Sequence, residues 1–333
     1  MQINNVKKFE NKKGELDNKK VLFIATKNSD YLRIVQEINL IRSSTEELDV
    51  IVSVHKGYFL RIFDVILKIL FLNISKYDLV FVGFQPQFII PLFYWKLKKV
   101  TVWTDFFISL YDTLVFDRKR IKEQSFLARI VKWFDQFTLD KSDLIICDTI
   151  AHGNYFCEEF RICPEKVNVL YLEADKNIYY SKNVTKPNEY ADKYIVFYFG
   201  SILPLQGVEV VLEAAELLQG MDNVHFIVVG PIGNKIECKE MSNITYIQWL
   251  PQEDLAQYIA FSDLCLAGHF DKTIAKAKRT IPGKAYIYES MKKRIVLGDT
   301  VANHELFVAD ERHIFVEQGN ASALACIIEN CAN

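Results

Sequence analysis

Along most of this chain, short apolar runs alternate with longer amphipathic stretches. Residues 21–25 form a continuous apolar run of the kind that makes a buried parallel strand, and a stretch with helical spacing follows. The same rhythm repeats through the first half. The further strands expected there are 48–54, 78–82, 100–103, 143–147 and 167–172, and the expected helices are 31–43, 88–97, 121–137 and 151–160.

Residues 175–192 lose this rhythm and carry Pro187, so we expect a linker at 176–192. Alternation then restarts, which predicts an α/β fold of two Rossmann-like, doubly wound domains that face a cleft. The strands expected in the second half are 194–199, 224–229, 244–247, 264–266 and 295–297, and the helices are 208–218, 252–260, 285–293 and 321–328.

The expected boundaries follow from this division. A polar leader, 1–20, precedes a first domain, 21–175, and the second domain covers 193–333. Packing of the last helix back on the first domain stays open. Ligands of such sheets bind beyond the carboxyl ends of the strands, so the candidate residues are sought there.

Composition limits the classes of function. The 40 Lys and Arg residues against 42 Asp and Glu give a net charge of −2, which argues against a general nucleic-acid binder and makes any anion site local. The first twenty residues have no apolar core of a signal peptide, and no apolar run reaches the ~18–20 residues of a membrane span. We therefore expect a cytoplasmic protein, with contact at the inner face of the membrane left open.

The cysteines show no paired spacing. Without a C-x-x-C motif, neither a zinc site nor a disulfide framework is indicated, and most of the cysteines are interpreted as small core residues in a reducing compartment. The seven are Cys147, Cys157, Cys163, Cys238, Cys265, Cys326 and Cys331.

The most informative stretch is 268–299, in which basic residues surround the turn at Pro282 and Gly283. Lys276, Arg279 and Lys284 stand at the mouth of an expected helix, where cations and free backbone amides make a site for a diphosphate. A solvated basic loop is the alternative, and the stretch alone does not decide between them.

A glycine turn follows the first strand of the second half. Gly200 ends the strand, Gly207 precedes the next helix, and Ser201 and Gln206 lie between them. A glycine at a strand end lets a phosphate approach the backbone, and one before a helix leaves amides pointing at it. The alternative is an ordinary tight turn.

Polar residues also stand at strand ends in the first half. Asp105 is the candidate to orient or deprotonate an acceptor hydroxyl, facing the cleft, whereas Asp112 is interpreted as a helix N-cap. Asp148 and His152 occupy a similar strand end. For His152, ligand contact and a local hydrogen bond on the first turn of a helix both stay open.

Several motifs in order resemble the GT-B glycosyltransferases, and more specifically the retaining group called family 4 or "group 1", in a branch that assembles bacterial glycans. They are FGS-xx-P-xQG with EVVLEAAELL, KAKRTIPGK with GDTVANHELF, TDFFISLYDTLVFDRK and LIICDTIAHGNYF. The resemblance implies transfer of a sugar from a nucleotide diphosphate sugar such as a UDP-sugar to a glycan or polyprenyl-linked acceptor. It implies retention of configuration and no metal or other cofactor.

The resemblance also assigns roles. It implies a donor held by the second domain and an acceptor held by the first, with the leaving diphosphate neutralised by cations. The catalytic candidates are Asp105, Lys276 and Lys284; the donor-binding candidates are Gly200, Ser201, Gln206, Gly207, Arg279, Pro282 and Glu289; further candidates are Asp112, Asp148 and His152.

The chain departs from the family pattern at two places. Neutral Ser201 and Gln206 stand where the family usually has Arg and Lys, so Lys276, Arg279 and Lys284 are the expected replacements. The family glutamate that holds the ribose aligns with Ile287, two residues before Glu289. Two alternatives to a transferase therefore stay open: a non-catalytic subunit that binds a partner glycosyltransferase or a glycan, and a nucleotide-sugar 2-epimerase.

Aromatic and basic residues occur together in 58–72, 84–99 and 118–133 of the first half, as they do in helices on an anionic membrane surface. For 58–72, packing of the apolar face on the sheet is the favoured interpretation. For 118–133, packing and membrane contact both stay open.

Overall fold

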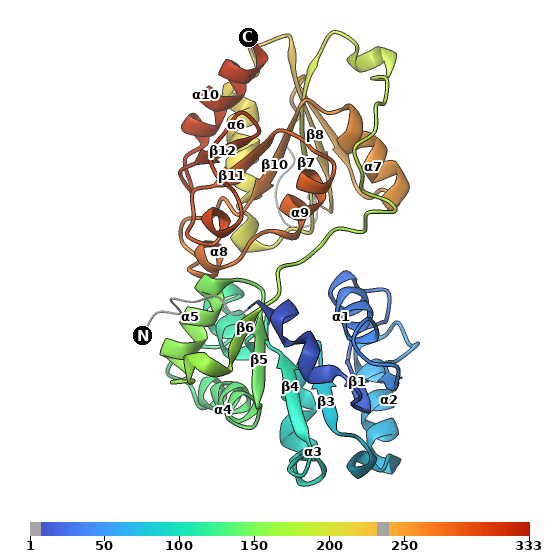
Figure 1. Ribbon diagram of the computed structural model, residues 1–333. Helices are drawn as coiled ribbons and strands as arrows, with labels where there is room; N and C mark the ends of the chain where they lie inside the picture. The colour runs from blue at the N-terminus through green and yellow to red at the C-terminus, as the bar shows by residue number, and fades with distance from the viewer. Residues whose placement is uncertain (1–7, 232–239) are drawn as a thin grey trace. The chain divides into compact units, whose positions relative to one another are not determined.

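The computed structural model describes residues 8–231 and 240–333 (Figure 1). The chain forms two compact units, the first ending at Glu173 and the second beginning at Ala174. Cys238 and the first seven residues of the expected leader lie outside the described residues.

A parallel six-stranded sheet with the order β2-β1-β3-β4-β5-β6 forms the centre of the first unit. Its strands are β1 (Val21–Ile24), β2 (Leu48–Ile51), β3 (Leu79–Val82), β4 (Thr101–Asp105), β5 (Leu144–Cys147) and β6 (Val167–Val169). Its helices are α1 (Leu32–Arg42), α2 (Tyr58–Phe71), α3 (Ile90–Leu97), α4 (Phe126–Asp140) and α5 (Ile150–Glu159). Short helical segments are η1 (Phe9–Leu16), η2 (Ile74–Lys76), η3 (Pro86–Phe88), the π-helix η4 (Asp112–Asp117) and η5 (Pro164–Lys166).

Different helices cover the two faces of the first sheet, because side chains alternate along each strand. The face with Val21 and Phe23 packs against η1 and α1. The face with Leu22 and Ile24 packs against α2 and α3. Ile145 of β5 lies on this same face, and there the sheet packs against α4 and α5. The helices α2, α3 and α4 therefore form one layer.

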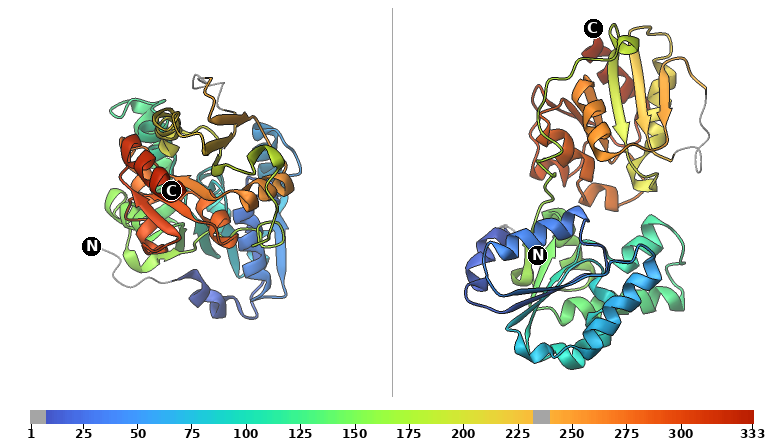
Figure 2. Two further views of the ribbon diagram at one scale, coloured as in Figure 1. Left: turned by 90° about the horizontal axis from the view of Figure 1, so that it is seen from above. Right: turned by 90° about the vertical axis from the view of Figure 1, so that its right-hand side faces the viewer.

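The second unit has its own parallel sheet, with the order β12-β11-β10-β7-β8-β9, and helices on both sides, as the right-hand view of Figure 2 shows. Its strands are β7 (Tyr194–Phe199), β8 (Val224–Val229), β9 (Ile244–Ile247), β10 (Leu264–Gly268), β11 (Ile295–Gly298) and β12 (His313–Val316). Its helices are α6 (Val208–Leu217), α7 (Gln252–Phe261), α8 (Lys276–Arg279), α9 (Gly283–Ser290) and α10 (Ala321–Ala332), with short segments η6 (Asn188–Tyr190), η7 (Pro204–Gln206) and η9 (Asn303–Glu305). Two doubly wound parallel sheets confirm the predicted fold class.

Several expected boundaries differ from the structure. The helix expected at 121–137 begins at Phe126, because the Ser125 hydroxyl caps it by accepting from the Ala128 amide at 3.2 Å. The strand β12 is absent from the sequence prediction, since its outer residues are only half buried. The last helix, α10, packs on α6 of its own unit.

Residues of the expected leader and linker pack on the two units. Phe9 and Leu16 of η1 are fully buried in the core beside α1, so the described part of the leader belongs to the first unit. In the linker, the Lys186 ammonium pairs with Asp263 at 2.5 Å, and the Tyr190 ring stacks on Phe261. The linker residues thus pack on the second unit.

Two further expectations concern burial. Of the described cysteines, Cys147, Cys157 and Cys265 are buried, whereas Cys163 and Cys326 are exposed, so the core interpretation holds for only part of them. No helix in the described ranges combines the length and the apolar character that crossing a membrane requires.

Candidate functional site

The strand order of the second sheet reverses between β7 and β10, so the loops that follow these strands flank a topological switch point. Open α/β sheets usually bind ligands at such a point, beyond the carboxyl ends of the strands. The loop after β7 is the predicted glycine turn, 200–207, and the loop after β10 leads into the basic run. The topology therefore brings the two most informative motifs of the sequence together.

Glycine is required at both ends of the turn after β7. Gly207 has φ +60°, and a Cβ there would lie 2.5 Å from the Asp271 backbone nitrogen. Gly200 has φ +153°, and a Cβ there would lie 2.7 Å from Gln206 Oε1. The close approach at Gly207 is fixed by a backbone hydrogen bond from the Phe270 amide to the Gln206 carbonyl at 3.1 Å.

Lys284 is the buried cation of this site. It lies in the first turn of α9, with its ammonium donating to Gln206 Oε1 at 3.0 Å and lying 3.8 Å from the centre of the Tyr198 ring. Tyr198 also donates its hydroxyl to Gln206 Oε1, at 2.7 Å. Burial lowers the pKa of Lys284 well below its ordinary value. Three predicted residues, Gly200, Gln206 and Lys284, therefore form one cluster, the Lys284 cluster.

The basic run is anchored to the glycine turn by apolar contacts. Ile274 and Ala277 of the run pack against Leu205 of the turn, which holds the short helix α8 beside it. Lys276 and Arg279 lie half-buried on α8. The run is thus a folded part of the site and not a solvated loop.

His269 is a site residue that the sequence reasoning missed. It directly follows β10, is buried, and its Nδ1 lies 3.2 Å from the Thr280 carbonyl oxygen. Burial, with the nearby charges of Lys284 and Lys276, lowers the pKa of His269 to about 3, so this imidazole is neutral. The signal that could have identified His269 in the sequence is its position at the carboxyl end of a strand.

Tyr198 was also missed. It lies on the same face of β7 as the core residue Val196, and a tyrosine in a buried strand, two positions before Gly200, was the available signal.

The start of α9 is open to an anion. Pro282 is its buried N-cap residue, and its side chain does not cap the first turn. The Pro282 carbonyl accepts from the Ala285 amide at 2.9 Å. Ser201 is exposed beside Gly200, where its hydroxyl is accessible. Backbone amides at a helix start, next to a buried ammonium, suit a diphosphate.

The structure places Glu289 away from the Lys284 cluster. Glu289 lies in the last turn of α9, toward the amino ends of the strands, whereas Lys284 lies in the first turn. The Glu289 carboxylate accepts from His313 Nε2 at 2.8 Å and pairs with Arg312 just before β12. This arrangement gives no support to Glu289 as a donor-binding residue.

Asp105 has a different set of partners from the expected acceptor hydroxyl. Its carboxylate accepts from Arg33 Nε at 3.1 Å and from Arg33 Nη2 at 2.8 Å, and both residues are buried. Arg33 also pairs with Glu37 at 3.2 Å and donates to the Leu170 carbonyl. Burial and the neighbouring Asp105 raise the pKa of Glu37. This buried network ties α1 to β4.

The other first-half candidates have local partners. Asp112 is not an N-cap: it is the first residue of η4, and the Tyr111 and Leu110 amides before it donate to Asp135. His152 is buried on α5, and its Nδ1 lies 2.7 Å from Asp148 Oδ1. The local hydrogen bond, one of the two alternatives for His152, is present.

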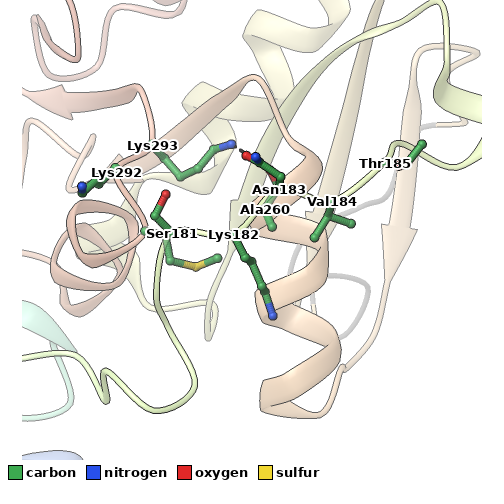
Figure 3. Close-up of a pocket in the computed structure, with 9 residues that line it drawn as sticks. Ser181, Lys182, Asn183, Val184, Thr185, Ala260, Lys292 and Lys293 are labelled. Atoms are coloured by element: carbon green, nitrogen blue, oxygen red, sulfur yellow. Dashed lines mark hydrogen bonds between the residues drawn. The ribbon is translucent and has the colours of Figure 1, made fainter.

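A separate cavity of about 340 Å³ lies in the second unit (Figure 3). It is lined by residues that precede strands, including Ala260 before β10 and Lys293 before β11, with Asn183 facing them. Its lining is therefore at the amino ends of the strands. Lys293 donates to the Ala260 carbonyl at 3.0 Å, and this cavity is distinct from the Lys284 cluster.

Comparison with known families finds a match that covers most of the second unit. Residues 193–333 match the family model described as "Glycosyl transferases group 1". Comparison with curated proteins finds no match. The predicted resemblance to this group of glycosyltransferases is thereby confirmed.

Solved structures extend the likeness to both units. HepE from Anabaena, crystallised with UDP-glucose, has a TM-score of 0.62 at 15% identity, covering 94% of this chain and 90% of its own. Sucrose-phosphate synthase from Thermosynechococcus elongatus has a TM-score of 0.65 at 11% identity, covering 93% and 89%. A glycosyltransferase from Rickettsia africae has a TM-score of 0.61 at 14% identity, covering 94% and 88%. At these identities the likeness concerns the fold, which is GT-B.

Proposed function

Because residues 193–333 match the model of the group 1 glycosyl transferases, we propose that this chain transfers a hexosyl group from a UDP-sugar to a glycan or a lipid-linked acceptor. The observation that carries the proposal is the Lys284 cluster: a buried ammonium and two glycines at the switch point of the second sheet. The choice of uracil is supported by HepE, which was solved with UDP and with UDP-glucose.

The cluster would act on the leaving group. As the bond between the sugar and the diphosphate breaks, negative charge grows on the diphosphate oxygens, and fixed donors stabilise it most effectively in a site that excludes water. Lys284 supplies a charge-assisted hydrogen bond, the start of α9 supplies backbone amides, and Lys276 and Arg279 add positive charge from α8. Since cations of the chain itself neutralise the diphosphate, we propose that transfer needs no metal. Retention of configuration comes from the resemblance and belongs to the same proposal.

Calorimetric titration of the purified chain with UDP, GDP, ADP, CMP and dTDP, without added metal, tests the donor site. We expect saturable binding of UDP. In Gly200→Ala the new Cβ would lie 2.7 Å from Gln206 Oε1 and 3.2 Å from Lys284 Nζ, so UDP should bind at least about tenfold more weakly. Gly220→Ala is the matched control, because a Cβ at Gly220 meets nothing within 4 Å.

Equal UDP affinity in the two glycine variants would remove the Lys284 cluster from the proposed site. Absence of binding by every nucleotide would refute the transferase proposal for this chain and favour the subunit that binds a partner. Conversion of a UDP-sugar without any acceptor would instead identify the 2-epimerase. Thermal unfolding of each variant shows whether a lost affinity reflects a lost fold.

A further inference from the structure

The helix α2 is apolar on the side that faces away from the sheet. Its buried residues, Arg61, Val65 and Ile69, recur every fourth position and mark the side that packs on the core. At 100° per residue, the opposite side carries a second apolar stripe. That stripe consists of the exposed residues Phe59, Leu60, Phe63, Leu67, Leu70 and Phe71. Phe59 and Phe71 are each 84% exposed, so packing on the sheet, the interpretation favoured from the sequence, explains only one side of this helix.

The neighbouring helices continue this surface. The Lys96 ammonium of α3 donates to the Ile69 and Leu72 carbonyls at 3.1 and 3.0 Å, which fixes α3 beside the end of α2. The Tyr94 ring meets Phe137 of α4 at 5.6 Å. The exposed apolar residues that α3 and α4 add are Leu92, Trp95, Phe126, Leu127 and Trp133. The outer face of the layer α2–α3–α4 is therefore an extended apolar surface, larger than the scattered apolar residues of an ordinary surface.

Positive charge accompanies this surface. Residues 55–141 contain 14 Lys and Arg against 8 Asp and Glu, a net charge of +6, whereas the whole chain carries −2. The acidic residues that are buried within this range are Asp105, Asp112, Asp117 and Asp135. The exposed groups are thus more cationic than the formal sum, and they include the run Arg118, Lys119 and Arg120 before α4.

We propose that the outer face of α2–α3–α4 binds an anionic lipid bilayer, with the apolar and aromatic side chains inserted at the headgroup level. Apolar residues flanked by Lys and Arg are the combination that binds such an interface. A second copy of the chain is the other possible occupant. In a two-fold dimer the same patch meets itself, so two surfaces of net positive charge would be placed against each other.

This inference does not depend on the proposed donor site, because lipid binding is measured without nucleotide or transfer. Where both hold, the lipid surface would bring the first unit to a membrane-embedded acceptor. A weak, reversible attachment is expected, since helices that lie on a bilayer insert only one face.

Co-sedimentation of the full chain with lipid vesicles tests the proposal. We expect binding to vesicles that contain phosphatidylglycerol, and little binding to vesicles of phosphatidylcholine alone. Leu60→Glu should reduce the bound fraction at least about tenfold, because it places a charge in the stripe of α2. Leu217→Glu on α6 is the matched control, since Leu217 is 58% exposed and Leu60 is 62% exposed on an equally regular helix. Thermal unfolding of both variants, without nucleotide, checks that each remains folded.

Three results would overturn the proposal. One is equal binding of Leu60→Glu and Leu217→Glu to the anionic vesicles. Another is a lack of binding by the wild-type chain to either lipid mixture. The third is dimerisation of the wild-type chain in sedimentation equilibrium that Leu60→Glu abolishes, which would assign the surface to a second copy.

Discussion

Replacing Lys284 with Met should separate stability from donor binding. Three features of the ammonium affect stability: the hydrogen bond to Gln206, the contact with the Tyr198 ring and the burial of the side chain. A hydrogen bond of a charged group contributes about 1.5–3 kcal/mol and a desolvated cation–π contact about 2 kcal/mol. Burying the charge costs several kcal/mol. These effects nearly cancel, so Lys284→Met should be as stable as the wild type or up to about 2 kcal/mol more stable.

The affinity for the donor should fall in Lys284→Met. Without the ammonium, the diphosphate loses a charge-assisted contact of about 3 kcal/mol, which corresponds to a roughly 100-fold weaker UDP affinity. Urea unfolding of the chain without ligand, together with calorimetric titration of UDP, measures both quantities.

The pH dependence gives an independent check. Burial lowers the pKa of Lys284 in the folded chain, so between that pKa and the ordinary value of 10.5 the unfolded chain holds more protons. Stability contributed by this group therefore rises with pH through that window, and Lys284→Met should lack the rise. This reasoning would be refuted if the free energy of unfolding of Lys284→Met were more than about 3 kcal/mol below that of the wild type, or if this variant bound UDP with wild-type affinity.

The neutral imidazole of His269 and the buried network of Arg33 allow two further predictions. The pKa of His269 is about 3 in the folded chain against 6.5 when unfolded, so stability should fall as pH drops below 6.5, by about 2 kcal/mol at pH 5. Urea unfolding at pH 7 and pH 5 should show that loss reduced in His269→Gln, and an identical loss in both proteins would contradict the burial argument. Arg33→Met should destabilise the chain by about 3–5 kcal/mol, because it leaves Asp105 buried without its cation. Lys68→Ala, which removes an exposed pair, is its control and should change the unfolding free energy by less than about 1 kcal/mol, so equal midpoints for the two variants would argue against the network.

The fold was largely predictable because both sheets are parallel and buried. Strands β7 and β8, which are largely buried, begin and end where their mostly apolar runs predict. The prediction fails where burial is incomplete or local hydrogen bonds decide. The strand β12 lies at the edge of its sheet, and α4 starts where the Ser125 hydroxyl caps it.

The candidate site was predictable in its motifs but not in its side-chain partners. The glycine turn and the basic run pointed to Gly200, Gln206 and Lys284, because such residues at strand ends and helix starts share one edge of a sheet. The roles of Asp105 and Glu289 depended on which cations lie opposite them, namely Arg33 and Arg312. Those contacts join segments far apart in the chain, and spacing along the sequence carries no information about them.

The contact at Gly207 has a consequence for engineering this chain. The Phe270 amide binds the Gln206 carbonyl, and the Phe270 carbonyl accepts from the Gly319 amide at 2.7 Å, so three loops are joined backbone to backbone. A loop transplanted alone from a protein with another donor preference would arrive without its matching neighbours and would lose these bonds. Chimeras of this unit should therefore exchange the loops after β7, β10 and β12 as one set.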